Sequence, residues 1–71
     1  MDKFLFYRKL DDLHITLQDL ADRLGISKQV LYLRVVGRRT MRREHIASIS
    51  NELNLTKDEI LDIFFPDIKF N

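Results

Sequence analysis

Seven cationic side chains and no anionic ones lie between Arg23 and Arg43, and they are the residues of this chain best suited to bind a ligand. We call residues 23–43 the basic segment, and its cations are Arg23, Lys28, Arg34, Arg38, Arg39, Arg42 and Arg43. Residues 1–22 hold three basic and five acidic residues, and residues 44–71 hold two basic and six acidic residues. Because these acidic flanks offset the basic segment, the net charge of the whole chain is only +1. A solvated charged face usually mixes both signs, whereas a block of one sign suits the phosphate groups of a nucleic acid.

The chain offers no comparable set of residues for catalysis or metal binding. His45 and Ser48 can share one helix face as a base and a nucleophile, but no third residue is placed to orient them. His14 is distant from His45 in the sequence, and the chain contains no cysteine. Two histidines without ligand spacing do not form a metal site. We therefore expect no enzyme activity, no metal, no cofactor and no small-molecule ligand.

The basic segment overlaps two predicted helices that are joined by a tight turn. The first covers residues 17–24, and Thr16 is placed to cap its start through the side-chain oxygen. Its apolar residues recur at helical spacing and are Leu17, Leu20, Ala21 and Leu24. Gly25 follows, at the position where many helices end in a left-handed conformation that glycine adopts at little cost.

The next helix is predicted to run from residue 27 to about residue 36. Ser27 can cap this helix, and Leu31 and Val35 give it an apolar face. Two short helices joined through a glycine turn, with a small residue (Ala21) where they press together, are typical of a helix-turn-helix motif. In that motif the first helix supports the second, whose exposed face can enter the major groove of DNA.

Three further helices are predicted from apolar periodicity and capping residues. One covers residues 3–13, and its apolar face consists of Phe6, Leu10 and Leu13. Another begins near Arg43 and ends at Asn54, which can adopt the left-handed conformation. The residues that this helix buries are Ile46, Ile49 and Leu53. The last helix begins with a capping box formed by Thr56 and Glu59 and is stopped by Pro66. Its apolar side consists of Ile60, Leu61, Phe64 and Phe65.

These five helices predict one compact all-α domain over residues 1–66, followed by a tail over residues 67–71. In the tail, Ile68 and Phe70 alternate with polar residues, a pattern typical of a short strand. The tail either pairs with its copy in a second subunit, folds back over the bundle, or frays. The N-terminal apolar run is too short for a signal peptide, and no segment is long enough to span a membrane. We therefore expect a soluble, cytoplasmic protein.

Several residues share their order and spacing with a known family. They are Leu20-Ala21, Leu24-Gly25-Ile26-Ser27, Leu31 and Gly37, followed by the pattern IASISNELNLTKDEIL. On these residues the chain resembles the Cro and cI repressor-like helix-turn-helix family, also called the xenobiotic-response-element type, over about residues 5–64. Its small size and basic loop are most similar to a phage-type or prophage-type Cro-like regulator. The resemblance implies a protein of a bacterial cell or a phage-infected host.

The chain departs from the pattern of this family at three places. Leu10 and Val35 stand where many members bury an arginine–glutamate pair, and replacing both partners with apolar residues is compatible with the fold. Arg34 stands where the family usually has a buried aliphatic residue. Either its stem lies along the core with the guanidinium outside, or the helix ends or rotates differently here. Leu17 stands where the family often has a phosphate-binding glutamine, and Gln18 is adjacent to it.

A recognition helix reads base edges with the exposed residues near its start and on the following turn. The predicted base-contacting residues are Ser27, Lys28, Gln29, Tyr32 and Leu33. The predicted phosphate-contacting residues are Thr16, Gln18, Arg34, Arg38, Arg39, Arg42 and Arg43. A lone helix-turn-helix reads few base pairs, so we expect two copies joined through apolar residues of the last helix and the tail. The predicted dimerisation residues are Phe64, Phe65, Ile68 and Phe70.

These expectations indicate a sequence-specific regulator of transcription that binds double-stranded DNA, acting as a repressor on a palindromic operator as a homodimer. The alternative is a protein-interaction module on the same fold, an antitoxin or anti-repressor component that does not read DNA. The aromatic residues near the two ends of the chain would then mark the partner surface, and they are Phe4, Phe6, Phe64, Phe65 and Phe70. The basic segment favours the first hypothesis, since an interaction module needs no unbroken cationic block.

Overall fold

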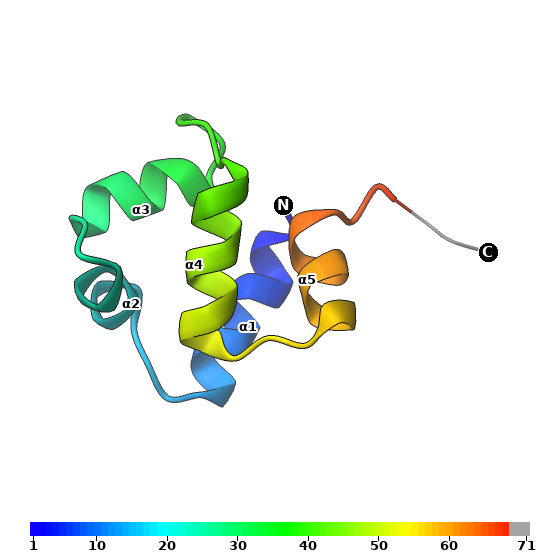
Figure 1. Ribbon diagram of the computed structural model, residues 1–71. Helices are drawn as coiled ribbons and strands as arrows, with labels where there is room; N and C mark the ends of the chain where they lie inside the picture. Colours follow the sequence, from blue (N-terminus) through cyan, green and yellow to red (C-terminus); the bar gives the residue numbers. More distant parts are fainter. Residues whose placement is uncertain (69–71) are drawn as a thin grey trace.

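Residues 1–68 are described by the computed structural model, and their regular structure is helical (Figure 1). The helices are α1 (Lys3–Asp12), α2 (Leu17–Leu24), α3 (Lys28–Val35), α4 (Arg43–Leu53) and α5 (Lys57–Phe64). No strand forms within residues 1–68, and the all-α prediction is confirmed. The predicted strand of the tail includes Phe70, which lies outside the described residues.

Short polar side chains fix the starts of four helices by accepting hydrogen bonds from backbone N–H groups of the first turn. The three caps predicted from sequence are confirmed: Thr16 accepts from Asp19 at 3.0 Å, Ser27 accepts from Val30 at 3.1 Å, and Thr56 accepts from Glu59 at 3.2 Å. Asp2 caps α1 in the same way, at 3.1 Å from the N–H of Leu5. Each such cap contributes about 1 kcal/mol, which matters for helices of only two or three turns.

Four helices end at a residue in the left-handed conformation, which turns the chain sharply toward the next element. The two predicted cases are confirmed, since Gly25 has a φ of 71° and Asn54 a φ of 52°. His14 (φ 57°) and Gly37 (φ 85°) do the same after α1 and α3, and neither was predicted. In each case the following residue donates its N–H back into the last turn of the helix, as Ile26 does to the carbonyl of Ala21 at 3.1 Å. This Schellman arrangement keeps the connections short.

The core lies where α1, α2, α3 and α4 meet, and α5 closes one side of it. Its largest fully buried side chains are Phe6, Leu10, Leu20, Leu31, Ile49 and Leu53. Leu10 and Val35 are each 2% exposed and belong to this same cluster. Apolar packing therefore fills the place that the resemblance assigns to a buried ion pair, and no charge is left uncompensated there.

Two parts of the predicted core are wrong. Leu13 is 41% exposed, because α1 ends at Asp12 and the chain turns at His14, so that Ile15 packs against the core instead. On α5, Ile63 is 3% exposed and was missed, whereas Phe65 was expected on the apolar side but is 39% exposed. The buried face of α5 follows Ile60, Ile63 and Phe64, at spacings of three and four residues, and not the neighbouring face that carries Leu61.

The arrangement of the helices separates α3 from α5. Helix α2 packs against both α3 and α4, and α1 packs against α5. Figure 1 shows α3 and α5 on opposite sides of α4, with the loop that joins α3 to α4 at one end of the molecule. The two helices approach each other only at their C-terminal ends, where Val36 and Gly37 after α3 border a pocket with Phe64 and Phe65.

Candidate nucleic-acid interface

Helix α3 presents a polar face to solvent because its apolar residues point toward α2 and the core. Leu31 and Val35 are buried, while Lys28 and Gln29 in the first turn are exposed. Tyr32 follows one turn later with 48% of its surface exposed. The predicted base-contacting residues therefore share an outer face, except that Leu33 is half-buried and the hydroxyl of Ser27 is engaged as the helix cap.

The start of α2 places two predicted phosphate contacts at the surface. Thr16 is exposed, and its N–H donates to the carboxylate of Asp19 at 2.9 Å while its hydroxyl accepts from the Asp19 N–H. The hydrogen bond from the Thr16 backbone N–H to the carboxylate, followed by the effect of the Thr16 side chain on that carboxylate, holds the pKa of Asp19 below its usual range. Gln18 is also exposed, and its side-chain amide donates to Asp22 at 2.8 Å. In the free protein, Thr16 is therefore hydrogen-bonded to Asp19 and Gln18 to Asp22.

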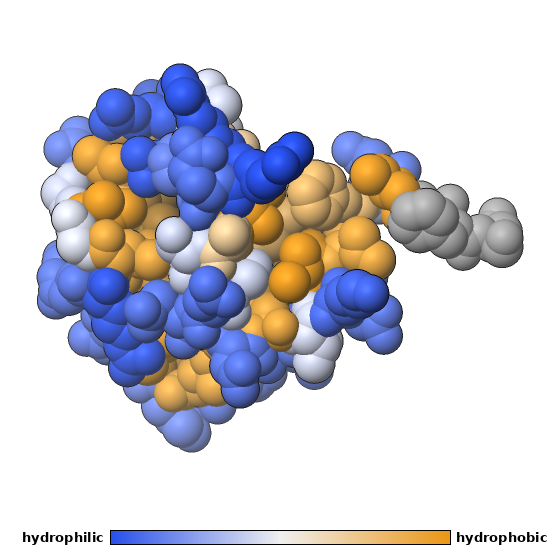
Figure 2. All heavy atoms as spheres, in the orientation of Figure 1, coloured by the Kyte–Doolittle hydropathy of each residue, from blue (hydrophilic) through white to orange (hydrophobic). Residues whose placement is uncertain are grey.

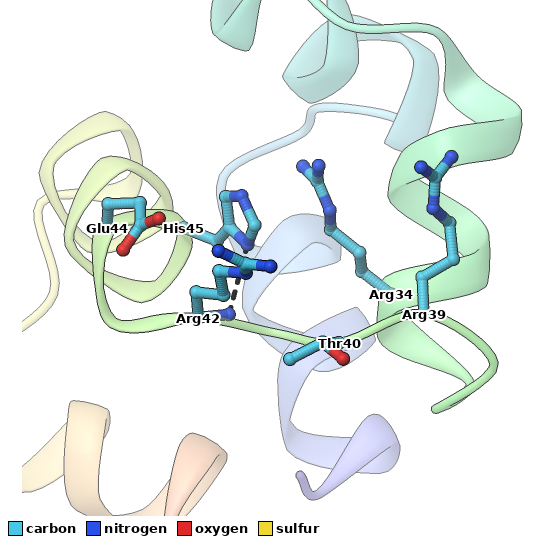
Figure 3. A pocket seen from close by; sticks show the side chains of 6 residues that line it. All are labelled: Arg34, Arg39, Thr40, Arg42, Glu44 and His45. Atoms are coloured by element: carbon cyan, nitrogen blue, oxygen red, sulfur yellow. Dashed lines mark hydrogen bonds between the residues drawn. The ribbon is translucent and has the colours of Figure 1, made fainter.

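The larger group of predicted phosphate contacts surrounds a polar pocket between α3 and the start of α4 (Figure 3). The pocket has a volume of about 370 Å³ and is lined by Arg34, Arg39, Thr40, Arg42, Glu44 and His45. Three guanidinium groups and one carboxylate give it an excess of positive charge. Arg38 and Arg43 are exposed beside it on the same loop and helix start. The structure therefore brings together arginines from α3, from the loop and from the start of α4.

Arg34 lies with its stem beside apolar residues and its charged end at this pocket. It is half-buried, and it borders a small cavity of about 80 Å³ with Leu24, Leu31 and Ile49. The same side chain also lines the polar pocket. The stem of Arg34 therefore lies along the core and its guanidinium lies outside, which was the first of the two alternatives for this residue. Helix α3 itself ends at Val35, close to its expected end.

The loop that carries Arg38 and Arg39 is held to the end of α3 by its backbone. The N–H groups of Arg38 and Arg39 donate to the carbonyl of Leu33 at 2.8 and 3.1 Å, and Gly37 supplies the left-handed turn that makes this possible. The arginine side chains themselves stay exposed. The backbone is therefore held beside the end of α3, while the guanidinium groups are exposed and can reach a ligand.

His45, which the sequence offers as a candidate catalytic base, belongs to this site. Its ring lies in the polar pocket, where its Nδ1 atom accepts the backbone N–H of Arg42 at 3.0 Å (Figure 3). The signal in the sequence was its position, because the third residue of a helix is where a capping-box side chain reaches back. Ser48 is exposed and donates its hydroxyl to the carbonyl of Glu44 at 2.9 Å, so it is not paired with the histidine.

The residues predicted to join two subunits are divided by their burial. Phe64 is only 8% exposed and belongs to the core, so it offers little surface to a partner. Phe65 and Ile68 are 39% and 51% exposed, and the Ile68 N–H donates to the Phe65 carbonyl at 3.1 Å. Figure 2 shows hydrophobic residues over α5 and the segment after it, and hydrophilic residues over the loop between α3 and α4. Phe70, the fourth predicted residue, lies outside the described part of the chain.

Residues 1–68 contain neither a candidate cluster of metal ligands nor a candidate membrane-spanning helix. No group of three or more histidine or acidic side chains there is arranged to hold a metal ion. None of the helices in that part of the chain has the length and apolar character needed to cross a membrane.

Comparison with known proteins identifies the helix-turn-helix region. The family described as Cro/C1-type HTH DNA-binding domain matches residues 8–66, which is most of the chain and includes all of α2 to α5. The search of curated proteins found no match, and neither did the search of solved structures.

Proposed function

Because this chain belongs to the Cro/C1-type helix-turn-helix family of DNA-binding domains, we propose that it is a sequence-specific transcriptional repressor that places α3 in the major groove. The observation that carries this proposal is the alignment of two surfaces. The exposed face of α3 holds Lys28, Gln29 and Tyr32, and the arginines of the following loop flank that same helix. Donors for base edges thus lie next to cations for phosphates, as a groove-binding helix requires.

Each group of residues has a separate role in this proposal. The amide of Gln29 pairs with the two hydrogen-bonding atoms on the major-groove edge of adenine, and Lys28 donates to guanine. The methyl groups of Leu33 and the ring of Tyr32 meet thymine methyl groups, and Ser27 positions the start of the helix. The arginines of the pocket and loop bind phosphates and set the position of α3 without selecting a sequence. Thr16 and Gln18 hold the adjacent phosphate at the start of α2.

We further propose that two copies bind a palindromic operator as a homodimer. One copy of α3 covers only a few base pairs, and two copies about 34 Å apart would contact successive major grooves on one side of the duplex. Phe65 and Ile68 are exposed apolar residues on which a second copy can pack. Phe65 borders a pocket with Gly37 and Arg39 at the end of α3, so the second copy would lie next to the basic loop. A repressor acts by occupying such an operator.

The test is binding to duplex DNA as a function of salt, followed by selection from a random pool. If each subunit neutralises about four phosphates, the logarithm of the binding constant of the dimer will fall with log salt at a slope near −7. Selection will return a palindrome with half-sites about one helical turn apart. Weak, salt-independent binding and no enriched sequence would overturn the proposal.

A variant of Phe4, assayed for both DNA binding and partner binding, tests the alternative of a protein-interaction module. Phe4 is 74% exposed on α1, an unusual position for a large aromatic side chain, and it is the observation that favours this alternative. Loss of partner binding in Phe4→Ser with no DNA binding by the unmodified protein would establish it. DNA binding that Phe4→Ser leaves unchanged would exclude this alternative and support a DNA-binding function.

A further inference from the structure

The imidazole of His45 is held by a hydrogen bond that determines which of its nitrogens carries a proton. The backbone N–H of Arg42 points at Nδ1 over 3.0 Å, and a backbone N–H can only donate. The Nδ1 atom must therefore be the acceptor, and in the neutral ring the proton resides on Nε2. The loop end before α4 thus selects a tautomer with a hydrogen-bond donor directed away from the helix.

That donor belongs to the polar pocket lined by the arginines. Arg34 arrives from α3, Arg39 from the loop, and Arg42 from the residue before α4, and Glu44 is the carboxylate on the rim. Figure 3 shows the free ring nitrogen of His45 on the same side as the guanidinium of Arg34. With the imidazole neutral, the three arginines and the one glutamate leave the pocket with a charge of +2. Such a set of converging N–H donors is complementary to a tetrahedral oxyanion.

We propose that His45 donates its Nε2–H to a backbone phosphate of DNA that is bound in this pocket by Arg34, Arg39 and Arg42. The inference rests on the proposed function, because it names a further residue of the same interface. His45 then has two simultaneous roles: Nδ1 caps α4, and Nε2 contacts the ligand. The cap orients the ring before DNA arrives, so the donor is already in place when the phosphate enters.

A purely structural role for His45 makes a different prediction. Capping needs only an acceptor at the third residue of the helix, and glutamate is a usual residue at that position. His45→Glu therefore keeps the acceptor for the Arg42 N–H, but it removes the donor and places a negative charge in the pocket. If His45 were only a cap, this variant would fold and bind DNA as the unmodified protein does, apart from the general effect of one added negative charge.

The experiment measures binding of the full chain to a random-sequence duplex at about 0.1 M salt. The matched control is Asn51→Glu, which adds a negative charge on the exposed face of the same helix, about 9 Å further along its axis. We expect His45→Glu to lose at least about tenfold more affinity than the control, because it removes one hydrogen bond to a charged group and also places its carboxylate against the phosphate. Circular dichroism melting will show both variants folded. Equal losses in the two variants would overturn the proposal.

A second measurement follows the ring directly. Long-range ¹H–¹⁵N correlation spectra of the unmodified protein at neutral pH will show Nε2 of His45 protonated and Nδ1 unprotonated. Addition of the random duplex will shift the Nε2 resonance of His45 and leave that of His14, which lies exposed at the turn after α1, nearly unchanged. Binding of the duplex without a shift at His45, or the opposite tautomer, would overturn this inference alone. No binding of the unmodified protein at all would overturn the proposed function with it.

Discussion

The ammonium group of Lys9 on α1 lies 2.7 Å from a carboxylate oxygen of Glu59 on α5. The other carboxylate oxygen of Glu59 accepts the backbone N–H of Thr56 at 2.9 Å, which completes the capping box of α5. One side chain therefore both starts α5 and ties it to α1. The hydrogen bond from Lys9, followed by that from the Thr56 backbone, holds the pKa of Glu59 below its ordinary value.

This contact predicts a loss of stability in acid. The pKa of Glu59 is lower in the folded protein than its value of about 4.3 in the unfolded chain. The contribution of ionised Glu59 to folding stability is therefore complete above the unfolded pKa and disappears as the pH falls through the folded pKa. Glu59→Gln can still cap α5 but cannot form an ion pair with Lys9. We expect Glu59→Gln to lower the free energy of unfolding, measured with urea, by up to about 1 kcal/mol at neutral pH and by less near pH 3. Asp58→Asn, its exposed neighbour, is the control, and an equal cost at both pH values would contradict the prediction.

The loop arginines are expected to supply affinity without specificity. Arg38→Ala combined with Arg39→Ala should weaken binding to all duplexes by similar factors and flatten the salt dependence by about 0.9 for each phosphate that the variant no longer neutralises. Arg8→Ala, on the exposed surface of α1, removes an arginine far from α3 in the sequence and serves as the control. An unchanged slope in the double variant would remove the loop from the interface.

Sequence preference is expected to depend on the first turn of α3. Gln29→Ala, and to a lesser degree Lys28→Ala, should each lose about 1–3 kcal/mol on the best operator. Affinity for random duplex should change little in Gln29→Ala, because that side chain carries no charge. Competition titrations with selected and random duplexes measure both quantities. If Gln29→Ala kept the same preferred sequence at full affinity, α3 would enter the groove in a different orientation.

Gly25 is expected to be required for its backbone conformation and not for space. A Cβ atom at this position would meet no heavy atom within 4 Å, but the φ of 71° disfavours residues with a side chain. Gly25→Val should therefore cost about 1–2 kcal/mol of unfolding free energy, and Gly25→Asn clearly less. Asn54→Gly, at the equivalent end of α4, should be neutral or slightly stabilising. Chemical denaturation compares the variants, and equal stability of the valine and asparagine variants would show that this turn can relax.

The segment after Pro66 is expected to join subunits. A chain that stops at Pro66 keeps α1 to α5 and their core, so it should fold, but it loses Ile68 from the exposed apolar surface. Dimerisation by sedimentation and operator affinity should fall together. Phe65→Ser, which removes the other exposed apolar residue while leaving the tail present, should have the same effect. Full-strength dimeric binding by both variants would place the interface elsewhere on the molecule.

The sequence alone determined the local features of this protein. The caps at Thr16, Ser27 and Thr56 and the left-handed ends at Gly25 and Asn54 were predicted because each depends on a side chain and a backbone only a few residues apart. The boundaries of α2 and the all-α class followed from these signals and from apolar periodicity. The charge of the basic segment could likewise be counted without coordinates.

The tertiary structure decided the features that depend on contacts between distant residues. Which face of α5 is buried was set by its packing against α1, which selected Ile63 for the core and left Phe65 exposed. Arg34 and His45 come from different helices, and only the crossing of α3 and α4 places both at one pocket. Periodicity within a helix indicates that one face is apolar. Packing against the neighbouring helix decides which residues of that face are buried, and a short stretch of sequence does not contain this information.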